Sequence, residues 1–203
     1  MKQWTLLLAL IAYTLTGFAQ DEEEAPERRG FKRENLFTGG SVSLGFGNRS
    51  FSAGVSPVFG YKIADWIDAG LVGNYLYTSY RHYFVANDKL RQSNYGGGVF
   101  TRLYPVNFLF AQAQFEHNFI TLKYIPANGG STEKFTTSAN SLLVGAGYAE
   151  GRVPGMPSSF FSLAILFDVS GNESSPYMDN QGKPVPIFRA GLNIYPFRPR
   201  RSY

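Results

Sequence analysis

The chain has 203 residues, of which 16% are aromatic and only 17% are charged, below the usual level of about 25%. Its formal net charge is +4, and much of the basic excess lies in the C-terminal tail at Arg198, Arg200 and Arg201, which is poor evidence for nucleic-acid binding. There is no cysteine, and this excludes disulfides, thiolate metal sites and acylation of a lipoprotein cysteine.

The N-terminal residues predict a secretory signal peptide. Lys2 precedes the apolar run LLLALIAYTL (6–15), and the small residues Gly17 and Ala19 precede the predicted cut, so the signal peptide would span 1–19. An uncleaved anchor helix is the alternative, but the run is short for a membrane span. Residues 20–36 are highly charged and have no apolar period, and we predict a flexible periplasmic lead-in there, followed by one domain over 37–203.

Beyond the lead-in, apolar and polar residues alternate in segments divided by turn residues. The stretch AQAQFEHNF (111–119) is typical, because every second residue from Ala111 to Phe115 is apolar and Phe119 keeps the same parity. Side chains of a β-strand point alternately to opposite faces, so each such segment predicts a strand with one apolar face. The predicted strands are 38–48, 51–62, 67–83, 93–105, 107–124, 139–151, 159–170 and 185–197.

The non-apolar faces of these segments hold glycines, serines and a few charges, with almost no lysine, unlike a water-exposed surface. We therefore predict that Phe115 and Phe119 face lipid and that Gln114 and Glu116 face a lumen. Connections also alternate between short ones (62–66, 105–107, 153–158) and longer polar ones (84–93, 126–138, 171–184). This pattern predicts an all-β, closed antiparallel up-and-down transmembrane β-barrel of about eight strands, with a periplasmic N-terminus and extracellular long loops. A soluble ligand-binding barrel is the weaker alternative.

Two further features concern the ends and the continuity of the strands. Pro57 lies inside the second segment and removes a ladder hydrogen bond, which predicts a bulge or a displaced strand end, whereas Pro186 lies near the start of the last segment and is easier to accommodate. Aromatic residues at segment ends predict two interfacial girdles, made of Tyr61, Trp66, Tyr80, Tyr83, Tyr104, Tyr124, Tyr195 and Phe197.

Several stretches carry a family resemblance. They are GGSVSLGFGN (39–48), VSPVFGYKIADWIDAGLVGNYLY (55–77), YGGGVFTRLYPVNFLFAQAQFEHN (95–118), SLLVGAGYAEG (141–151) and SPYMDN followed by PIFRAGLNIYPF (175–197). The sequence resembles small, porin-like outer-membrane β-barrel proteins of the Bacteroidetes. The resemblance implies a Gram-negative outer-membrane location, contact with outer-membrane lipid, and insertion by the barrel assembly machinery. Such chains usually end in an aromatic residue that this machinery reads, and here Phe197 and Tyr203 are both candidates.

Residues able to support catalysis are few. His82 lies near Ser79 at the outer end of the third segment, and some outer-membrane lipid hydrolases use such a pair, but a spacing of three places the two side chains on opposite faces and no orienting acid is evident. His117 has the lipid-facing parity, and the acidic run 21–24 is typical of a solvated segment. The glycine runs 96–98 and 145–147 lack the features of a phosphate loop. We predict no catalytic residue, metal site or cofactor.

Four charged residues have the inward parity: Arg102, Glu116, Asp168 and Arg189. Buried charges must be paired, and a barrel of about eight strands leaves an interior that side chains fill, so we predict a charged network that plugs the lumen. The predicted function is a non-enzymatic outer-membrane barrel with a structural or interaction role, in which a protein partner would bind the outer loops. A lipid-modifying enzyme at the rim, with His82 as its base, and a narrow ion channel are the alternatives.

Overall fold

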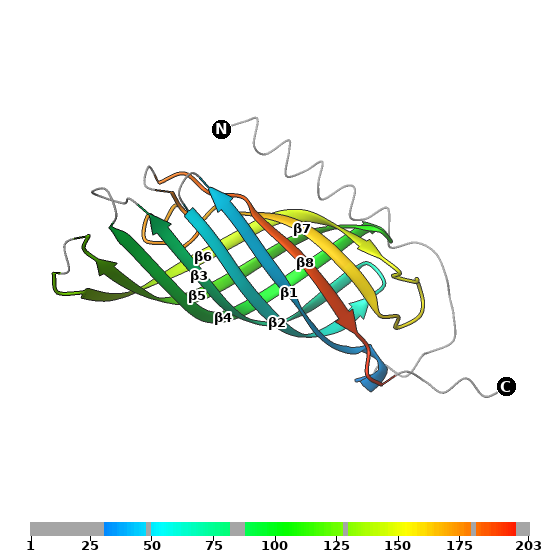
Figure 1. The fold of residues 1–203 in the computed structure, drawn as a ribbon. Coiled ribbons are helices and arrows are strands. Elements are labelled where there is room, and N and C mark those ends of the chain that lie inside the picture. Colours follow the sequence, from blue (N-terminus) through cyan, green and yellow to red (C-terminus); the bar gives the residue numbers. More distant parts are fainter. Residues whose placement is uncertain (1–30, 48–49, 82–87, 128–129, 180–181, 198–203) are drawn as a thin grey trace, which may run out of the picture. The chain divides into compact units, whose positions relative to one another are not determined.

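The computed structural model describes residues 31–47, 50–81, 88–127, 130–179 and 182–197. After a short 3-10 helix, η1 (Arg33–Asn35), each strand pairs antiparallel with the next, and β8 pairs with β1 to close the barrel (Figure 1). The predicted all-β, up-and-down, eight-stranded closed barrel is therefore confirmed. The predicted signal peptide lies outside the described residues. The strands are β1 (Leu36–Gly47), β2 (Ser50–Ala64), β3 (Ile67–Arg81), β4 (Lys89–Val106), β5 (Leu109–Ile125), β6 (Glu133–Glu150), β7 (Phe160–Asp168) and β8 (Ile187–Ile194).

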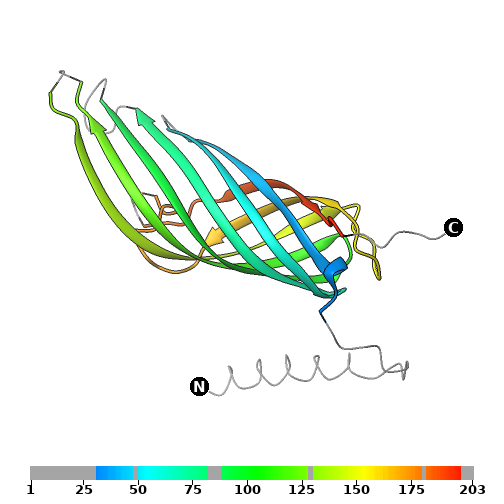
Figure 2. The ribbon, with the colours of Figure 1, turned by 90° about the horizontal axis from the view of Figure 1, so that it is seen from below.

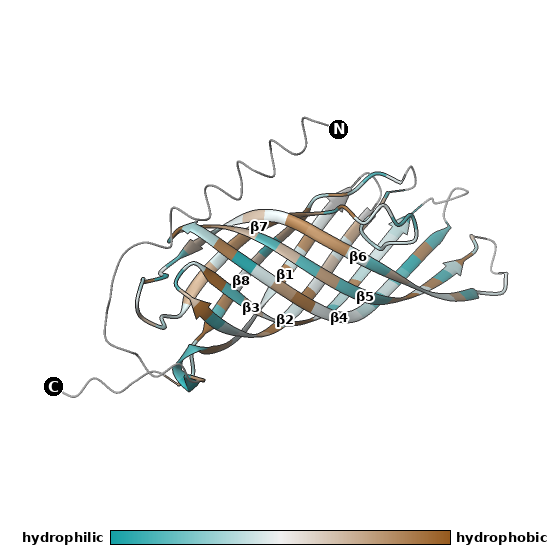
Figure 3. Cartoon of the chain, turned by 180° about the vertical axis from the view of Figure 1, so that it is seen from behind, coloured by the Kyte–Doolittle hydropathy of each residue, from teal (hydrophilic) through white to brown (hydrophobic). Residues whose placement is uncertain are grey.

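The barrel has an apolar outside and a largely polar inside. On β5, Phe115 and Phe119 are 47% and 44% exposed, whereas Gln114 and Glu116 between and beside them are buried. Figure 3 shows the same alternation of hydrophobic and hydrophilic residues along other strands. This arrangement is the reverse of a soluble protein and follows from the period of two in the sequence. In the described part of the chain, no helix is both long and apolar enough to cross a membrane.

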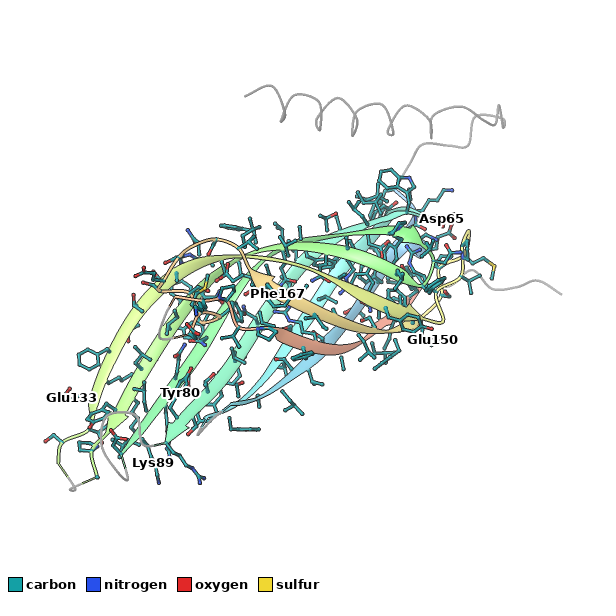
Figure 4. The ribbon with its side chains drawn as sticks, turned by 90° about the horizontal axis from the view of Figure 1, so that it is seen from above. Asp65, Tyr80, Lys89, Glu133, Glu150 and Phe167 are labelled. Atoms are coloured by element: carbon teal, nitrogen blue, oxygen red, sulfur yellow. The ribbon has the colours of Figure 1, made fainter. Side chains whose placement is uncertain are left out.

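The connections alternate between the two ends of the barrel, as predicted. The connections at 65–66, 107–108 and 151–159 lie at the end where β1 begins and β8 finishes, and we call this the turn end; the first two are short, as predicted, but 151–159 is not. The connections after β1, β3, β5 and β7 lie at the opposite end, which we call the loop end. Figure 4 shows Asp65 and Glu150 at the turn end and Lys89 and Glu133 at the loop end.

Strands β3–β6 extend past the rest of the barrel at the loop end. The strand ladder between β6 and β7 covers only Leu143–Glu150 of β6, so the first half of β6 continues beyond β7 (Figure 2). The prediction that 84–93 and 126–138 are loops is therefore wrong in part, because Lys89 onward belongs to β4 and Glu133 onward belongs to β6. Most outward positions in this extension are basic or hydroxylic, with Ile125 as an apolar exception, so the hydrophobic alternation that marks a strand weakens before the strand itself ends.

Pro57 does not cause the predicted bulge. The β2–β3 register is the same on both sides of it, and the register shift between these two strands lies instead between Lys62 and Ala64. Pro57 is exposed on the outward face, its cross-strand neighbour on β1 is Gly40, and a Cβ on Gly73 of β3 would lie 3.4 Å from Pro57 Cγ. Two glycines thus leave room for the ring within a continuous strand.

Candidate functional site

The centre of the lumen is built around the Glu116 carboxylate. This side chain is fully buried, and it accepts hydrogen bonds from Tyr177 Oη at 2.8 Å, from Gln114 Nε2 and from Asn74 Nδ2. Arg189 Nη2, from β8, lies 3.4 Å from Glu116 Oε1 and forms the only ion pair of this centre among the described residues. Glu116 therefore links β3, β5, β8 and the β7–β8 connection through its two oxygens.

The other two predicted lumen charges are held without an ion pair to a described residue. Arg102 donates to Gln112 Oε1 at 2.9 Å and to Asn193 Oδ1 at 3.2 Å, and its guanidinium carbon lies 4.9 Å from the Phe100 ring centroid. Asp168 accepts from Ser175 Oγ and from two backbone amides. All four predicted charges are buried inside the barrel, but only Glu116 and Arg189 form an ion pair.

A polar chain nevertheless connects Arg102 with Glu116. Gln112 Nε2 donates to Gln114 Oε1 at 2.7 Å, and Gln114 in turn donates to Glu116. Every second residue of β5 from Gln112 to Asn118 is buried and polar, so this one strand supplies the axis of the network. Neutral amides thus solvate the Arg102 guanidinium and connect it to Glu116, whose own charge is paired with Arg189.

A second buried ion pair, which the sequence did not predict, lies at the turn end. Arg152 Nη2 is 3.1 Å from Asp68 Oδ1, with side chains 3% and 0% exposed, and the Arg152 guanidinium stacks 3.6 Å from the Tyr104 ring centroid. Asp68 has the inward parity, but Arg152 belongs to the connection 151–159, where no periodic pattern could reveal its direction. In the nearby turn, partial burial acts to raise the pKa of the Asp65 carboxyl, but hydrogen bonds from Lys62 and from the Gly155 amide outweigh burial and lower it.

Aromatic side chains fill the turn end of the lumen. Ring centroids of Phe37 and Tyr195 lie 5.5 Å apart, and those of Tyr104 and Phe110 lie 5.6 Å apart. Tyr104 and Tyr195 are 5% and 3% exposed, so the prediction that they belong to an exposed girdle is wrong. The position of Tyr104 near a strand end suggested a girdle residue. The direction of a strand side chain, however, follows the alternation along the strand. Tyr104 lies two residues after the inward-facing Arg102 and therefore also faces inward. The aromatic layer consists of Phe37, Phe100, Tyr104, Phe110, Phe160 and Tyr195.

The remaining predicted girdle residues divide into two groups. Trp66 and Phe197 are 60% and 53% exposed at the turn end, and Tyr61 is half-buried at an outward position of β2. Tyr80 and Tyr124 have the inward parity instead: Tyr80 lines a cavity at the loop end, and Tyr124 donates to Asp88 at 3.3 Å. Tyr83 lies outside the described residues.

The β7–β8 connection (169–186) folds back into the barrel. Tyr177 packs with Leu143 and Leu166 and donates to Glu116, while Ser175 bonds Asp168 and lies 2.8 Å, Oγ to Oγ, from Ser141. Burial, and next the Glu116 carboxylate, raise the pKa of the Tyr177 hydroxyl far above its usual range, so it remains a proton donor. In Figure 2 this orange loop stops short of the tips of β4–β6. We call the connection the plug loop.

A cavity of about 600 Å³ lies above the plug loop, and we call it the vestibule. Its strand side is formed by the inner face of the β3–β6 extension and carries apolar side chains together with Gln92 and Thr137, whereas its loop side is polar and acidic. The strand side includes Tyr80, Leu90, Ile120 and Leu122, and the loop side includes Glu173, Ser174 and Asp179.

The histidines do not form a catalytic or metal site in the described part of the chain. His117 is exposed, as its parity predicts, with Nδ1 2.7 Å from Asn140 Oδ1 and its ring edge-on to Phe119. His82 lies outside the described residues. Residues 31–47, 50–81, 88–127, 130–179 and 182–197 contain no group of three His, Asp or Glu side chains placed to hold a metal ion.

Fold and interior together define a class: a closed eight-stranded up-and-down barrel with an apolar exterior and a lumen filled by polar and aromatic side chains. No protein-family model matches the chain, and no curated protein sequence does. Among solved structures the chain is similar to Ail, the attachment invasion locus protein of Yersinia pestis, with 10% identity over 78% of this chain and 96% of that chain and a TM-score of 0.46. A second structure of Ail, in complex with the heparin analogue sucrose octasulfate, gives 10% identity over 78% of this chain and 93% of that chain and a TM-score of 0.43.

Proposed function

We propose that this chain is an integral outer-membrane barrel of a Gram-negative bacterium. The support is the row of exposed apolar side chains on every strand, such as Val99, Phe115 and Leu163, at 53%, 47% and 49% exposure. Exposure of so large an apolar surface to water is unfavourable, whereas the hydrocarbon chains of a lipid bilayer would cover it. In this orientation the turn end and the N-terminus face the periplasm and the loop end faces outside. The predicted signal peptide (1–19) and assembly by the barrel machinery are part of this proposal, and membership of the Bacteroidetes family stays a prediction.

The proposed girdles differ from those that the sequence predicted. Outward aromatic residues at the loop end include Tyr75, Tyr95 and Phe119, and the last two stack with ring centroids 5.4 Å apart. At the turn end, Trp66 and Tyr148 are 60% and 41% exposed. Aromatic rings of this kind are favoured at the level of lipid head groups, so these two rows would mark the borders of the lipid-covered band.

We propose that the protein binds a partner or ligand at its outer end and neither catalyses a reaction nor conducts. The observation that carries this proposal is an open vestibule above a lumen filled at two levels, by the plug loop with its Glu116 network and by the aromatic layer. A molecule could enter from outside and contact the vestibule walls, but the filled lumen would stop it from passing through. Binding therefore fits this geometry better than transport.

Two measurements test the proposal together. The protein should be found in the outer-membrane fraction and should run as a band whose mobility changes on boiling, as a closed detergent-resistant barrel does. In planar bilayers it should give no steady conductance. A soluble periplasmic protein without a mobility shift would overturn the membrane assignment, and lipid hydrolysis lost in His82→Ala would support the rim enzyme instead.

Shortening the plug loop should leave the barrel closed. We expect that replacing residues 172–184 by a short Gly-Ser linker produces no steady conductance, because the aromatic layer at the turn end stays in place. Planar-bilayer recording of the purified variant is the measurement. Phe37→Ala with Phe160→Ala, plug loop intact, is the matched control and should also stay closed. Steady channels in the loop variant alone would favour the narrow ion path and contradict the two-level closure.

A further inference from the structure

Five basic side chains share the outward face of the β3–β6 extension: Arg81, Lys89, Arg91, Lys123 and Lys134. Three of them form a row across neighbouring strands, because Arg91 pairs with Lys123 and Lys123 pairs with Lys134. A further basic pair, Arg81 opposite Lys89, lies beside this row. Lys89 is labelled in Figure 4 at the loop end.

This face concentrates like charge, and no acidic side chain among the described residues pairs with it. All five side chains are exposed, and none forms an ion pair with a described residue. The acidic neighbours lie elsewhere: Asp88 is 1% exposed and accepts a hydrogen bond from Tyr124, and Glu133 occupies an inward position of β6. Like charges directly opposite one another destabilise a sheet, so an anionic group outside the protein would stabilise this arrangement.

The basic row lies just beyond the apolar band. Moving outward along β5, Phe119 of the aromatic row is followed by Thr121 and then by Lys123. Four residues of strand span about 13 Å, or roughly 10 Å along the membrane normal at a typical barrel tilt. In the proposed orientation this places the basic row at the level of outer-leaflet head groups, and long Lys and Arg side chains can reach down toward them.

We propose that this basic face binds the phosphate groups of an anionic glycolipid in the outer leaflet. The inference rests on the proposed membrane orientation. Lipid is the favoured source of the phosphate because the face is continuous with the lipid-covered surface and points away from the barrel axis. A soluble polyanion entering from outside would meet the vestibule, whose loop side is instead acidic at Glu173 and Asp179.

The test uses the full mature chain in detergent micelles, titrated with fluorescent bis-phosphorylated lipid A and, in parallel, with the same lipid after its phosphates are removed. Arg91→Ser/Lys123→Ser/Lys134→Ser removes the row, and serine matches the hydroxyl residues that already occur on this face. Lys32→Ser/Arg33→Ser/Lys183→Ser removes the same charge elsewhere. Basic residues near a head-group surface contribute roughly a factor of five each, so the row variant should bind lipid A about 100-fold more weakly. The control variant should bind like the wild type, and binding should weaken as salt is added.

Each contrary outcome is distinct. Equal affinity of wild type and row variant for lipid A, or equal affinity of the wild type for both lipids, would overturn the proposal. It would also be overturned if the row variant lost affinity for a soluble sulfated oligosaccharide but kept its affinity for lipid A. The boiling-dependent gel shift is measured on every variant. Its absence in the wild type would instead show that the proposed membrane barrel is wrong.

Discussion

Replacing Arg189 by methionine should lower the free energy of unfolding by about 3–5 kcal/mol, because it leaves the Glu116 carboxylate buried without a cation. Arg189 and Glu116 are 8% and 0% exposed, so water cannot take over the lost interaction without entering the lumen. The remaining donors, Tyr177 among them, satisfy the oxygens but do not neutralise the charge. The measurement is reversible urea unfolding in lipid vesicles, followed by tryptophan fluorescence and by the gel shift.

A double variant separates lost charge compensation from lost packing. Arg189→Met with Glu116→Gln should recover most of the stability, because the amide oxygen can still accept from Tyr177 and position 116 no longer holds a buried charge without its cation. Arg102→Met is the matched control, since Arg102 bonds two neutral amides, Gln112 and Asn193, and its removal leaves no carboxylate unpaired. A loss in Arg189→Met no larger than in Arg102→Met, with no recovery in the double variant, would show that the ion pair contributes little.

In the proposed membrane orientation, the parts of this fold that the sequence predicts are those that would lie against lipid. Along 107–124 the outward residues must be apolar and the inward residues small or polar, so the alternation predicts both the strand β5 (Leu109–Ile125) and the direction of Phe115 and Glu116. The same requirement explains where prediction failed. Beyond the proposed lipid-covered band, outward residues such as Lys123 need not be apolar, and the first residues of β4 and β6 therefore resembled polar loops.

The interior was predictable in composition but not in its contacts. Parity placed Arg102, Glu116, Asp168 and Arg189 on the inward face, yet which charges pair depends on the stagger of strands around the whole ring. Arg189 and Glu116 are 73 residues apart in sequence, and Tyr177, 61 residues from Glu116, reaches it from an irregular loop. No local pattern encodes such contacts. The prediction for Tyr104 is wrong for a different reason. Aromatic residues are common in girdles at strand ends, but the alternation along β4 points Tyr104 into the barrel, where it is buried.

Two neighbouring glycines of β4 should respond very differently to alanine. Gly98 has the inward parity, and a Cβ there would lie 1.7 Å from the backbone carbonyl oxygen of Phe115 on β5. Rotation of a side chain cannot relieve this overlap, so β4 and β5 would have to separate where Glu116 forms its network. Gly97 faces outward, and its nearest neighbour, the Val72 carbonyl oxygen, would lie at 3.3 Å.

We expect Gly98→Ala to cost at least about 3 kcal/mol and to reduce sharply the yield of heat-shifted barrel on refolding, because the backbone itself must move. Gly97→Ala should cost less than about 1 kcal/mol, since a methyl group at an outward strand position needs only a small adjustment. Both substitutions lower the conformational entropy of the unfolded chain by the same amount. The difference between their free energies of unfolding therefore reports the steric room for a methyl group inside the barrel. Similar stabilities for the two would mean that β4 and β5 can part without loss, and that the inward glycine is not needed for the close approach of these strands.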